Sequence, residues 1–185
     1  MELRILHLSD LHFTQKNDEQ DKKFKQLIET LVTQHEERPF DYIFVTGDII
    51  DKGKTEYFSV ALEYFNKLFN RLNFDGQNIF FVPGNHDLDF KIEENTDNIT
   101  REILKKARFD EIQNKEKENQ KILEKIKQRQ TAYFSFIKDL GVVEHQLQFC
   151  EERKDDVSII GINSSIFSAK EDHRKQIYFI NEQFE

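Results

Sequence analysis

The sequence predicts an α/β fold built on a parallel sheet, and three observations support this prediction. Short apolar blocks at residues 3–8, 42–45 and 78–82 have the length and composition of buried strands. Segments with three/four apolar spacing separate the blocks, which gives the strand-helix-strand-helix-strand order of a layered domain with crossover helices. Each block runs directly into Asp, Asn or His, as expected where the carboxyl ends of parallel strands line a ligand site.

The whole chain has the size and composition of one globular domain. Its 185 residues are 37% hydrophobic and 34% charged, with a net charge of -8 at pH 7, and this length is enough to bury a core. The acidic balance favours a small substrate over a nucleic acid, although a bound metal ion could reverse the charge locally. The single cysteine, Cys150, together with the lack of any leader-like or membrane-spanning apolar run, predicts a cytoplasmic protein with no membrane partner.

The first strand is expected over residues 3–9, with apolar side chains on both faces. His7 lies within it, and we expect a packed, hydrogen-bonded core histidine rather than a ligand. Asp10 and His12 come after the strand. In an extended chain, side chains two residues apart point the same way, so both can converge on one ion. A helical pattern then begins at about Asp21 and predicts the first crossover helix.

The second strand, Asp41–Val45, ends in a glycine turn. Gly47 permits a sharp turn and a close approach of the backbone, and Asp48 follows it directly, where a carboxylate could bridge two metal ions. Asp51 lies three residues further on. It could support the site from behind the ligands or cap a turn, and its sequence context favours neither. Thr55–Asn70 is predicted as the second amphipathic helix.

The third strand ends at Pro83 and opens into Gly84-Asn85-His86-Asp87. From here the chain is predicted to remain one domain, over residues 1–185, with a charged helical insertion at about residues 93–130. That segment is rich in Lys, Glu, Gln and Asn and has no Gly or Pro. It is expected as a solvated helix or hairpin more than as a cap over the site.

The remaining elements are a helix, two strands and the start of a further helix. Thr131–Leu140 is predicted as a helix closed by Gly141. Val142–Cys150 and Val157–Ile162 are predicted as strands joined by a charged turn, and a helix is expected to begin near the end of the chain.

Five polar side chains follow the three strands: Asp10, His12, Asp48, Asn85 and His86. This mixture of oxygen and nitrogen donors suits Mn, Fe, Zn or Ni better than Ca. Two such ions about 4 Å apart can share a carboxylate, clamp the oxygens of a phosphate and lower the pKa of an attacking water. His86 could then give a proton to the leaving alcohol, with Asp51 holding its ring. The residues therefore predict a metal-dependent phosphoesterase.

Three segments strongly resemble the first three motifs of the calcineurin-like metallophosphoesterase family. They are Leu8-Ser9-Asp10-Leu11-His12, Gly47-Asp48-Ile49-Ile50-Asp51 and Gly84-Asn85-His86-Asp87. The resemblance covers residues 1–90, and more loosely the strand pair up to about residue 163. It implies a β-sandwich flanked by helices, with a dinuclear metal site at the strand ends.

The resemblance also implies a role for each matching residue. It assigns the metal ligands by position: Asp10 and His12 to the first ion, Asp48 to both ions, and Asn85 to the second. It makes His86 the catalytic histidine and Asp51 its partner, and it leaves Asp87 a supporting role in the turn.

The sequence departs from the family pattern after residue 90. The family has a further histidine and a later Gly-His-x-His, whereas this sequence has only His145 and His173 there, neither in a Gly-His or His-x-His context. We expect neither to be a ligand. On this reading the chain is the N-terminal part of a longer protein, its second metal site is incomplete, and its activity alone is weak.

Three functions are compatible with these residues. The first is hydrolysis of a small phosphomonoester or phosphodiester through two divalent metal ions. The second is a non-catalytic binding module of the same fold that uses the 93–130 segment as its contact surface. The third is a nuclease of the same family that needs a partner protein to supply basic contacts to nucleic acid.

Overall fold

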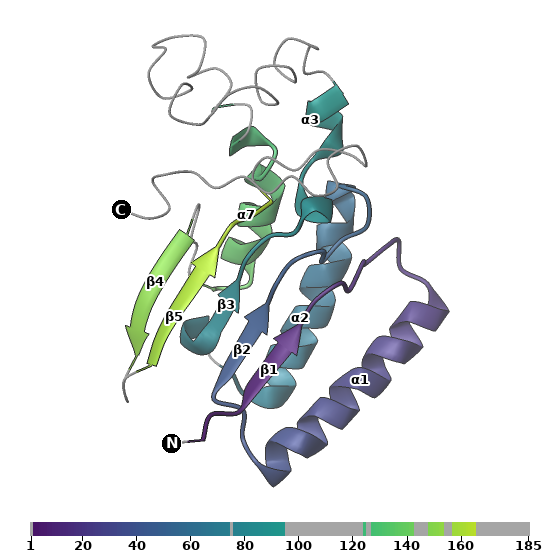
Figure 1. The fold of residues 1–185 in the computed structure, drawn as a ribbon. Coiled ribbons are helices and arrows are strands. Elements are labelled where there is room, and N and C mark those ends of the chain that lie inside the picture. The colour runs from purple at the N-terminus through teal and green to yellow at the C-terminus, as the bar shows by residue number, and fades with distance from the viewer. Residues whose placement is uncertain are drawn as a thin grey trace.

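A parallel sheet of three strands, in the order β1-β2-β3, forms the centre of the computed structural model (Figure 1). The strands are β1 (Ile5–Leu8), β2 (Tyr42–Val45) and β3 (Ile79–Phe81). Leu8 lies opposite Val45, which lies opposite Phe81, so the carboxyl ends of all three strands meet at one edge. This confirms the predicted α/β fold. The structure describes these residues: 2–74, 76–94, 124, 127–142, 148–153 and 157–165.

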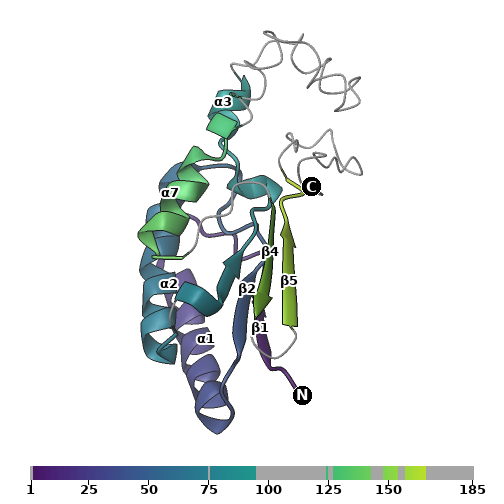
Figure 2. The ribbon, with the colours of Figure 1, turned by 90° about the vertical axis from the view of Figure 1, so that its left-hand side faces the viewer.

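Helices cover one face of this sheet, as Figure 2 shows from the side. They are α1 (Asp18–Glu37), α2 (Phe58–Leu72) and α7 (Thr131–Asp139). Phe65, at the middle of α2, is fully buried, and its ring contacts Phe13, Phe81 and Phe136. Aromatic rings from the sheet, a loop and two helices therefore form one core, which agrees with the many phenylalanines of the sequence.

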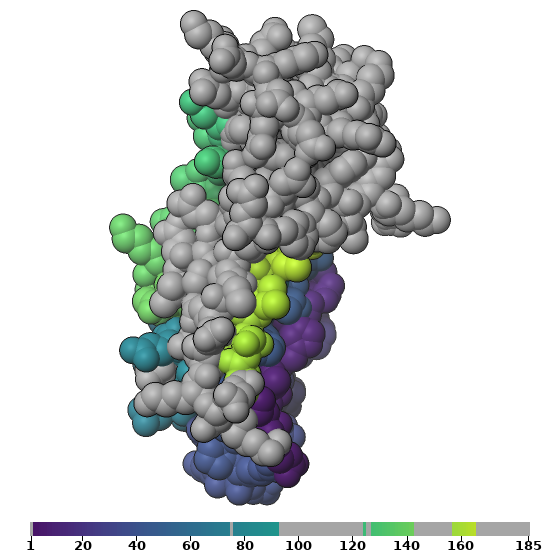
Figure 3. Space-filling model, turned by 60° about the vertical axis from the view of Figure 1, so that its left-hand side comes forward, coloured from purple at the N-terminus to yellow at the C-terminus, as the bar shows by residue number. Residues whose placement is uncertain are grey.

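The opposite face carries an antiparallel hairpin of β4 (Gln148–Arg153) and β5 (Val157–Ile162). Ile159 of β5 packs in one buried cluster with Tyr42 and Phe80 of the parallel sheet. The outer side of β5 lies at the surface of the molecule (Figure 3), where Ile160 is 67% exposed. The parallel sheet thus lies between a helical layer and the hairpin.

The hairpin corrects one predicted boundary. We expected the first strand of the pair to end at Cys150, but pairing continues to Arg153, which lies opposite Val157. Charged residues mark a turn in the sequence only statistically, because the hydrogen bonds of a ladder are made by the backbone. Residues 143–147 and 154–156 lie outside the described residues.

β1 differs from the expected strand with two buried faces. Its residues alternate between exposed and buried, with Ile5 43% exposed and His7 exposed. The His7 ring is hydrogen-bonded to the hydroxyl of Thr46 (Nε2–Oγ1, 2.7 Å). The prediction of a core histidine was therefore wrong. β1 lies at the edge of the sheet, while the described hairpin residue Ile159 packs on β2 and β3.

The other predicted elements agree with the structure where it describes them. The second helix begins as a 3-10 turn, η1 (Thr55–Tyr57), before α2. α7 ends just before Gly141, whose φ of 69° fits the predicted cap. Beyond α3 (Phe90–Glu94), most of the predicted 93–130 insertion lies outside the described residues, as do His145, His173 and the predicted last helix. No helix in the described part of the chain has the length and hydropathy needed to cross a membrane.

Candidate metal centre

Three loops leave the carboxyl edge of the parallel sheet and stay in contact beyond the strands. The N–H groups of Asp10, His12 and Phe13, after β1, donate to the carbonyls of residues 47, 48 and 49 at 3.2, 3.0 and 2.7 Å. The N–H of Asp51 returns a hydrogen bond to the carbonyl of Phe13 at 3.0 Å. The first two loops therefore run side by side, and the buried Phe13 ring anchors them to the core.

The backbone of these loops is strained at the candidate ligands. Asp10, His12 and Asp48 have φ values of 56°, 45° and 51°, in the left-handed region that non-glycine residues adopt rarely. Each such residue costs about 1–2 kcal/mol, and such strain is concentrated at functional sites. Asp10 and His12 were expected to converge because the chain is extended. They do converge, with Nε2 of His12 3.9 Å from Oδ1 of Asp10, but through a turned backbone.

Two glycines let the second and third loops approach each other. Gly47 has a φ of +88°, and a Cβ added to it would lie 2.2 Å from the backbone nitrogen of Gly84. A Cβ added to Gly84 would lie 2.2 Å from Oδ1 of Asp48. Both distances are far below van der Waals contact. Glycine is thus required at both positions, which supports the close approach that the sequence predicted for Gly47.

Two carboxylates connect the same pair of loops. Oδ1 of Asp48 accepts a hydrogen bond from the backbone N–H of His86 at 3.0 Å. Asp87 is completely buried, and its Oδ1 accepts from the N–H groups of Ile49 and Ile50 at 2.8 and 3.1 Å. Its Oδ2 accepts from the N–H of Gly84 at 2.9 Å. Burial raises the pKa of Asp87 to about 7, against the opposing effect of these three donors.

The first group of possible metal ligands is Asp10, His12 and Asp48. One ligand atom from each lies within 4.8 Å of the others. Two carboxylates and an imidazole suit a divalent transition metal. Nδ1 of His12 is buried and has no hydrogen-bond partner, whereas a buried polar atom is normally satisfied. The chemistry of the donor set therefore fits a bound metal ion in this group. The His12 nitrogen near Asp10 is Nε2, at 3.9 Å, and the unsatisfied Nδ1 is the other nitrogen of the same ring.

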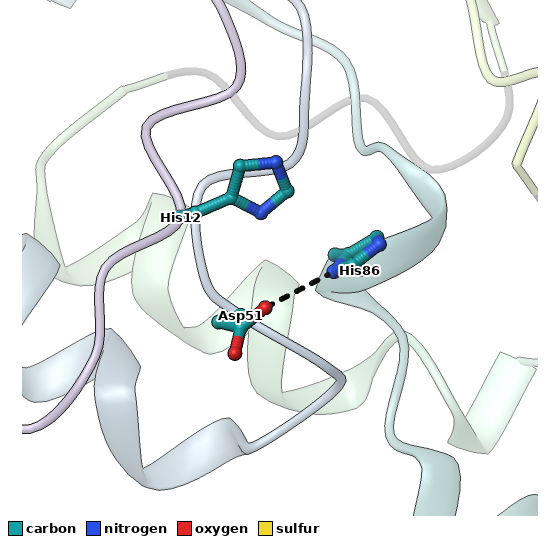
Figure 4. A group of neighbouring side chains, drawn as sticks. All are labelled: His12, Asp51 and His86. Carbon is teal, nitrogen blue, oxygen red and sulfur yellow. Dashed lines mark ion pairs between the residues drawn. The ribbon is translucent and has the colours of Figure 1, made fainter.

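The second group is His12, Asp51 and His86, again with one ligand atom from each within 4.8 Å of the others. Figure 4 shows these side chains facing one another from three separate loops. The rings of His12 and His86 meet edge to face, with centroids 4.8 Å apart. His12 thus belongs to both groups, so the two form one continuous cluster.

The ring of His86 has a hydrogen-bond partner that the sequence did not reveal. Its Nδ1 accepts from the backbone N–H of Lys52 at 3.1 Å, and the N–H of Gly53 donates to the His86 carbonyl at 2.9 Å. Oδ1 of Asp51, the expected partner, lies 3.6 Å from Nδ1, which is an ion-pair distance beyond hydrogen bonding. A backbone N–H cannot be recognised from the residue type. The glycine at position 53 was therefore the only feature of the sequence that could have indicated this turn.

The structure places Asn85 at the first residue of the turn η3 (Asn85–Asp87), next to His86, and exposed. Its assignment to a second ion stays a prediction. The other predicted site residues, from Asp10 to His86, lie in the two groups described above.

Comparisons with known proteins agree with this geometry. A family model described as calcineurin-like phosphoesterase matches residues 3–178. An uncharacterized metallophosphoesterase-like protein of Bacillus subtilis is 28% identical over 181 residues, which are 92% of this chain and 35% of that protein. A probable cyclic nucleotide phosphodiesterase of Coxiella burnetii is 31% identical over 86 residues, 46% of this chain and 32% of that protein.

The chain spans about a third of the length of these two curated relatives. The family model nevertheless matches nearly all of it, including the three loops of the candidate metal centre. This confirms the family that the three motifs indicated: the chain belongs to the calcineurin-like phosphoesterases.

Proposed function

We propose that this chain hydrolyses phosphoesters at a dinuclear metal centre, with His86 as the proton donor to the leaving group. The proposed ligands are Asp10 and His12 for one ion, Asp48 for both, and Asn85 for the second. The observation that carries the proposal is the convergence of Asp10, His12 and Asp48 at the carboxyl edge of a parallel sheet. Family membership supports the same chemistry.

The proposed ions are Mn, Fe, Zn or Ni, which suit this donor set. When bound, two such ions clamp the oxygens of a phosphate and lower the pKa of the attacking water. For this chemistry the protein has to keep the metal-binding side chains in a fixed orientation. Asp48 is suited to that task because its Oδ1 already accepts the N–H of His86, which fixes the orientation of the carboxylate and leaves Oδ2 available.

The proposed role of His86 follows from how its ring is held. Nδ1 faces the N–H of Lys52 and the carboxylate of Asp51, so Nε2 is the nitrogen available to a substrate. The neutral ring, whose Nδ1 accepts from Lys52, carries its hydrogen on Nε2. A ring protonated on both nitrogens gives up that hydrogen bond, and its positive charge is stabilised instead by the Asp51 carboxylate, 3.6 Å from Nδ1. Nε2 can donate its proton to a departing alkoxide.

A small phosphodiester is the substrate class we propose. The Coxiella relative is described as a probable cyclic nucleotide phosphodiesterase, and its match covers 46% of this chain. The net charge of -8 disfavours long-range attraction of a polyanion, whereas a small diester carries a single negative charge. Both arguments favour a small diester over nucleic acid.

The test is hydrolysis of 4-nitrophenyl phosphate and bis(4-nitrophenyl) phosphate by the full-length gene product with added Mn²⁺. We expect faster turnover of the diester and loss of activity in Asp48→Asn, which keeps the shape of the side chain but removes its charge. Asp18→Asn, in the exposed first turn of α1, is the matched control and should retain activity. Full activity in Asp48→Asn would refute the two-metal mechanism.

A further inference from the structure

We propose that Asp87 is a positioning residue whose carboxylate holds the loops after β2 and β3 at the spacing that the metal centre requires. The role goes beyond support of a local turn, because the residues it fixes lie next to a proposed metal ligand and the proposed proton donor. The expected effect of Asp87 on metal binding rests on the proposed function. The claim that Asp87 fixes the spacing of the two loops does not depend on it.

Asp87 uses both carboxylate oxygens, and it uses them on different loops. Oδ1 accepts from the consecutive N–H groups of Ile49 and Ile50, directly after Asp48. Oδ2 accepts from the N–H of Gly84, two residues before His86. One rigid, planar group thus sets the distance between the backbone that carries Asp48 and the backbone that carries His86.

The hydrogen bond from the His86 N–H to Asp48 Oδ1 runs in the opposite direction between the same loops. Each loop therefore offers a carboxylate to N–H groups of the other. If Asp87 is removed, the N–H groups of Ile49 and Ile50 lose their acceptor, so the backbone directly after Asp48 is no longer tied to the third loop. The contacts of His86 with Asp48, Lys52 and Gly53 remain, but they do not hold that stretch of backbone.

The surroundings of Asp87 leave no simple substitute for its carboxylate. Ile49 and Ile50 are completely buried, so their two N–H groups have little access to water as an alternative acceptor. Gly47 and Gly84 pack backbone to backbone beside it. On the other side, the N–H of Asp89 donates to the carbonyl of Arg129 at 2.9 Å, which attaches the end of the turn to the start of α7.

A merely structural role predicts a different result from a positioning role. A structural residue contributes to the free energy of unfolding, as any well-packed core residue does, and leaves the folded site unchanged. A positioning residue also sets the arrangement of the site within the folded protein. The edge-to-face contact of the His12 and His86 rings, at 4.8 Å, reports that arrangement without any metal.

The test uses Asp87→Asn and Asp87→Ala in the full-length protein. Asn keeps the shape, but its NH₂ group must face at least one of the three N–H donors, while Ala removes every acceptor. Leu68→Ala is the control, because Leu68 is completely buried in α2, outside the three loops. Two quantities are measured: the nuclear Overhauser effect between the ring protons of His12 and His86 in metal-free protein, and the affinity for Mn²⁺ from the EPR signal of the free ion.

We expect the ring-to-ring signal to be weakened in Asp87→Asn and lost in Asp87→Ala, and to persist in Leu68→Ala. We expect Mn²⁺ affinity to fall by about 10- to 100-fold in Asp87→Asn, as is typical when a group supporting metal ligands is lost, and to stay within about twofold in Leu68→Ala. An unchanged ring contact and Mn²⁺ affinity in Asp87→Asn would overturn the proposal. If the wild-type protein binds no Mn²⁺ but the ring contact still depends on Asp87, the positioning role stands and the proposed function fails.

Discussion

The backbone N–H of Lys52 donates a hydrogen bond to Nδ1 of His86, with the two nitrogens 3.1 Å apart. Lys52 has a φ of 52° and Gly53 a φ of +61°, and this double left-handed turn directs the two successive N–H groups to the ring and the carbonyl of His86. The hydrogen bond that holds the ring at this nitrogen therefore comes from the backbone, with the Asp51 carboxylate at 3.6 Å. The other nitrogen, Nε2, is the one that we propose donates the proton.

This arrangement predicts that the effect of removing His86 depends on the leaving group. An alkoxide needs a proton to depart, while 4-nitrophenolate is stable without one. His86→Gln should lower kcat by about 10²- to 10⁴-fold for an alkyl phosphodiester, and by much less for bis(4-nitrophenyl) phosphate. The measurement is kcat for both substrates at saturating Mn²⁺, with His35→Gln, at the far end of α1, as the control. Equal losses with both substrates would show that His86 does not act as the proton donor.

The contact between the second and third loops predicts a specific defect in Gly84→Ala. The new methyl group would lie 2.2 Å from Oδ1 and 2.4 Å from the backbone nitrogen of Asp48. We expect the free energy of unfolding to fall by about 1–3 kcal/mol, as in overpacked cores, and Mn²⁺ binding to be lost.

Gly141→Ala is the matched control for this substitution. Its added Cβ would meet nothing within 4 Å, although its φ of +69° still disfavours alanine by about 1–2 kcal/mol. Urea denaturation should therefore show a loss of stability in both variants, while Mn²⁺ binding should be lost only in Gly84→Ala. Normal Mn²⁺ affinity in Gly84→Ala would mean that the two loops need not be in contact.

The raised pKa of Tyr64 predicts that the protein loses stability in alkaline solution. Burial and a hydrogen bond from its hydroxyl to Oδ1 of Asp21, at 2.9 Å, raise the pKa of Tyr64 to about 12, from an ordinary value of 10.0. Between these two pH values the folded protein keeps a proton that the unfolded chain releases, so the free energy of unfolding falls as pH rises. Burial also raises the pKa of Tyr133 well above its ordinary value, so this tyrosine adds to the same slope.

Tyr64→Phe isolates the contribution of Tyr64. Urea denaturation of both proteins between about pH 9 and 11 should show a shallower decline in the variant, since it has no phenol to titrate at this position. At neutral pH the variant should be less stable by about 1 kcal/mol, because Asp21 loses a hydrogen bond. Parallel pH profiles for the two proteins would contradict the raised pKa.

The sequence was sufficient to predict the parallel sheet, its crossover helices and the loops that carry the candidate site. These features follow from apolar periodicity and from polar residues at strand ends, and both patterns can be read directly from the amino-acid sequence. The exposed face of β1 was missed because an apolar strand sequence does not say which faces other elements cover. His7 was misplaced for the same reason.

The details of the site depend on backbone conformation, which residue types specify poorly. Asp10 and His12 converge through left-handed residues, where the sequence suggested an extended chain. The N–H of Lys52 and the three donors to Asp87 are backbone groups that any residue except proline would provide. In the sequence, these close approaches are indicated only by the glycines at positions 47, 53 and 84.

The most direct test of the account is the number of metal ions bound by the full-length protein. After equilibration with Mn²⁺ and removal of free ions, elemental analysis should find two ions per chain in the wild type and fewer in Asp48→Asn, because this carboxylate is proposed to contact both. Asp18→Asn should bind as many ions as the wild type. If the wild type binds no transition metal, the chain is a binding module with a phosphoesterase fold, and the proposed catalytic centre is wrong.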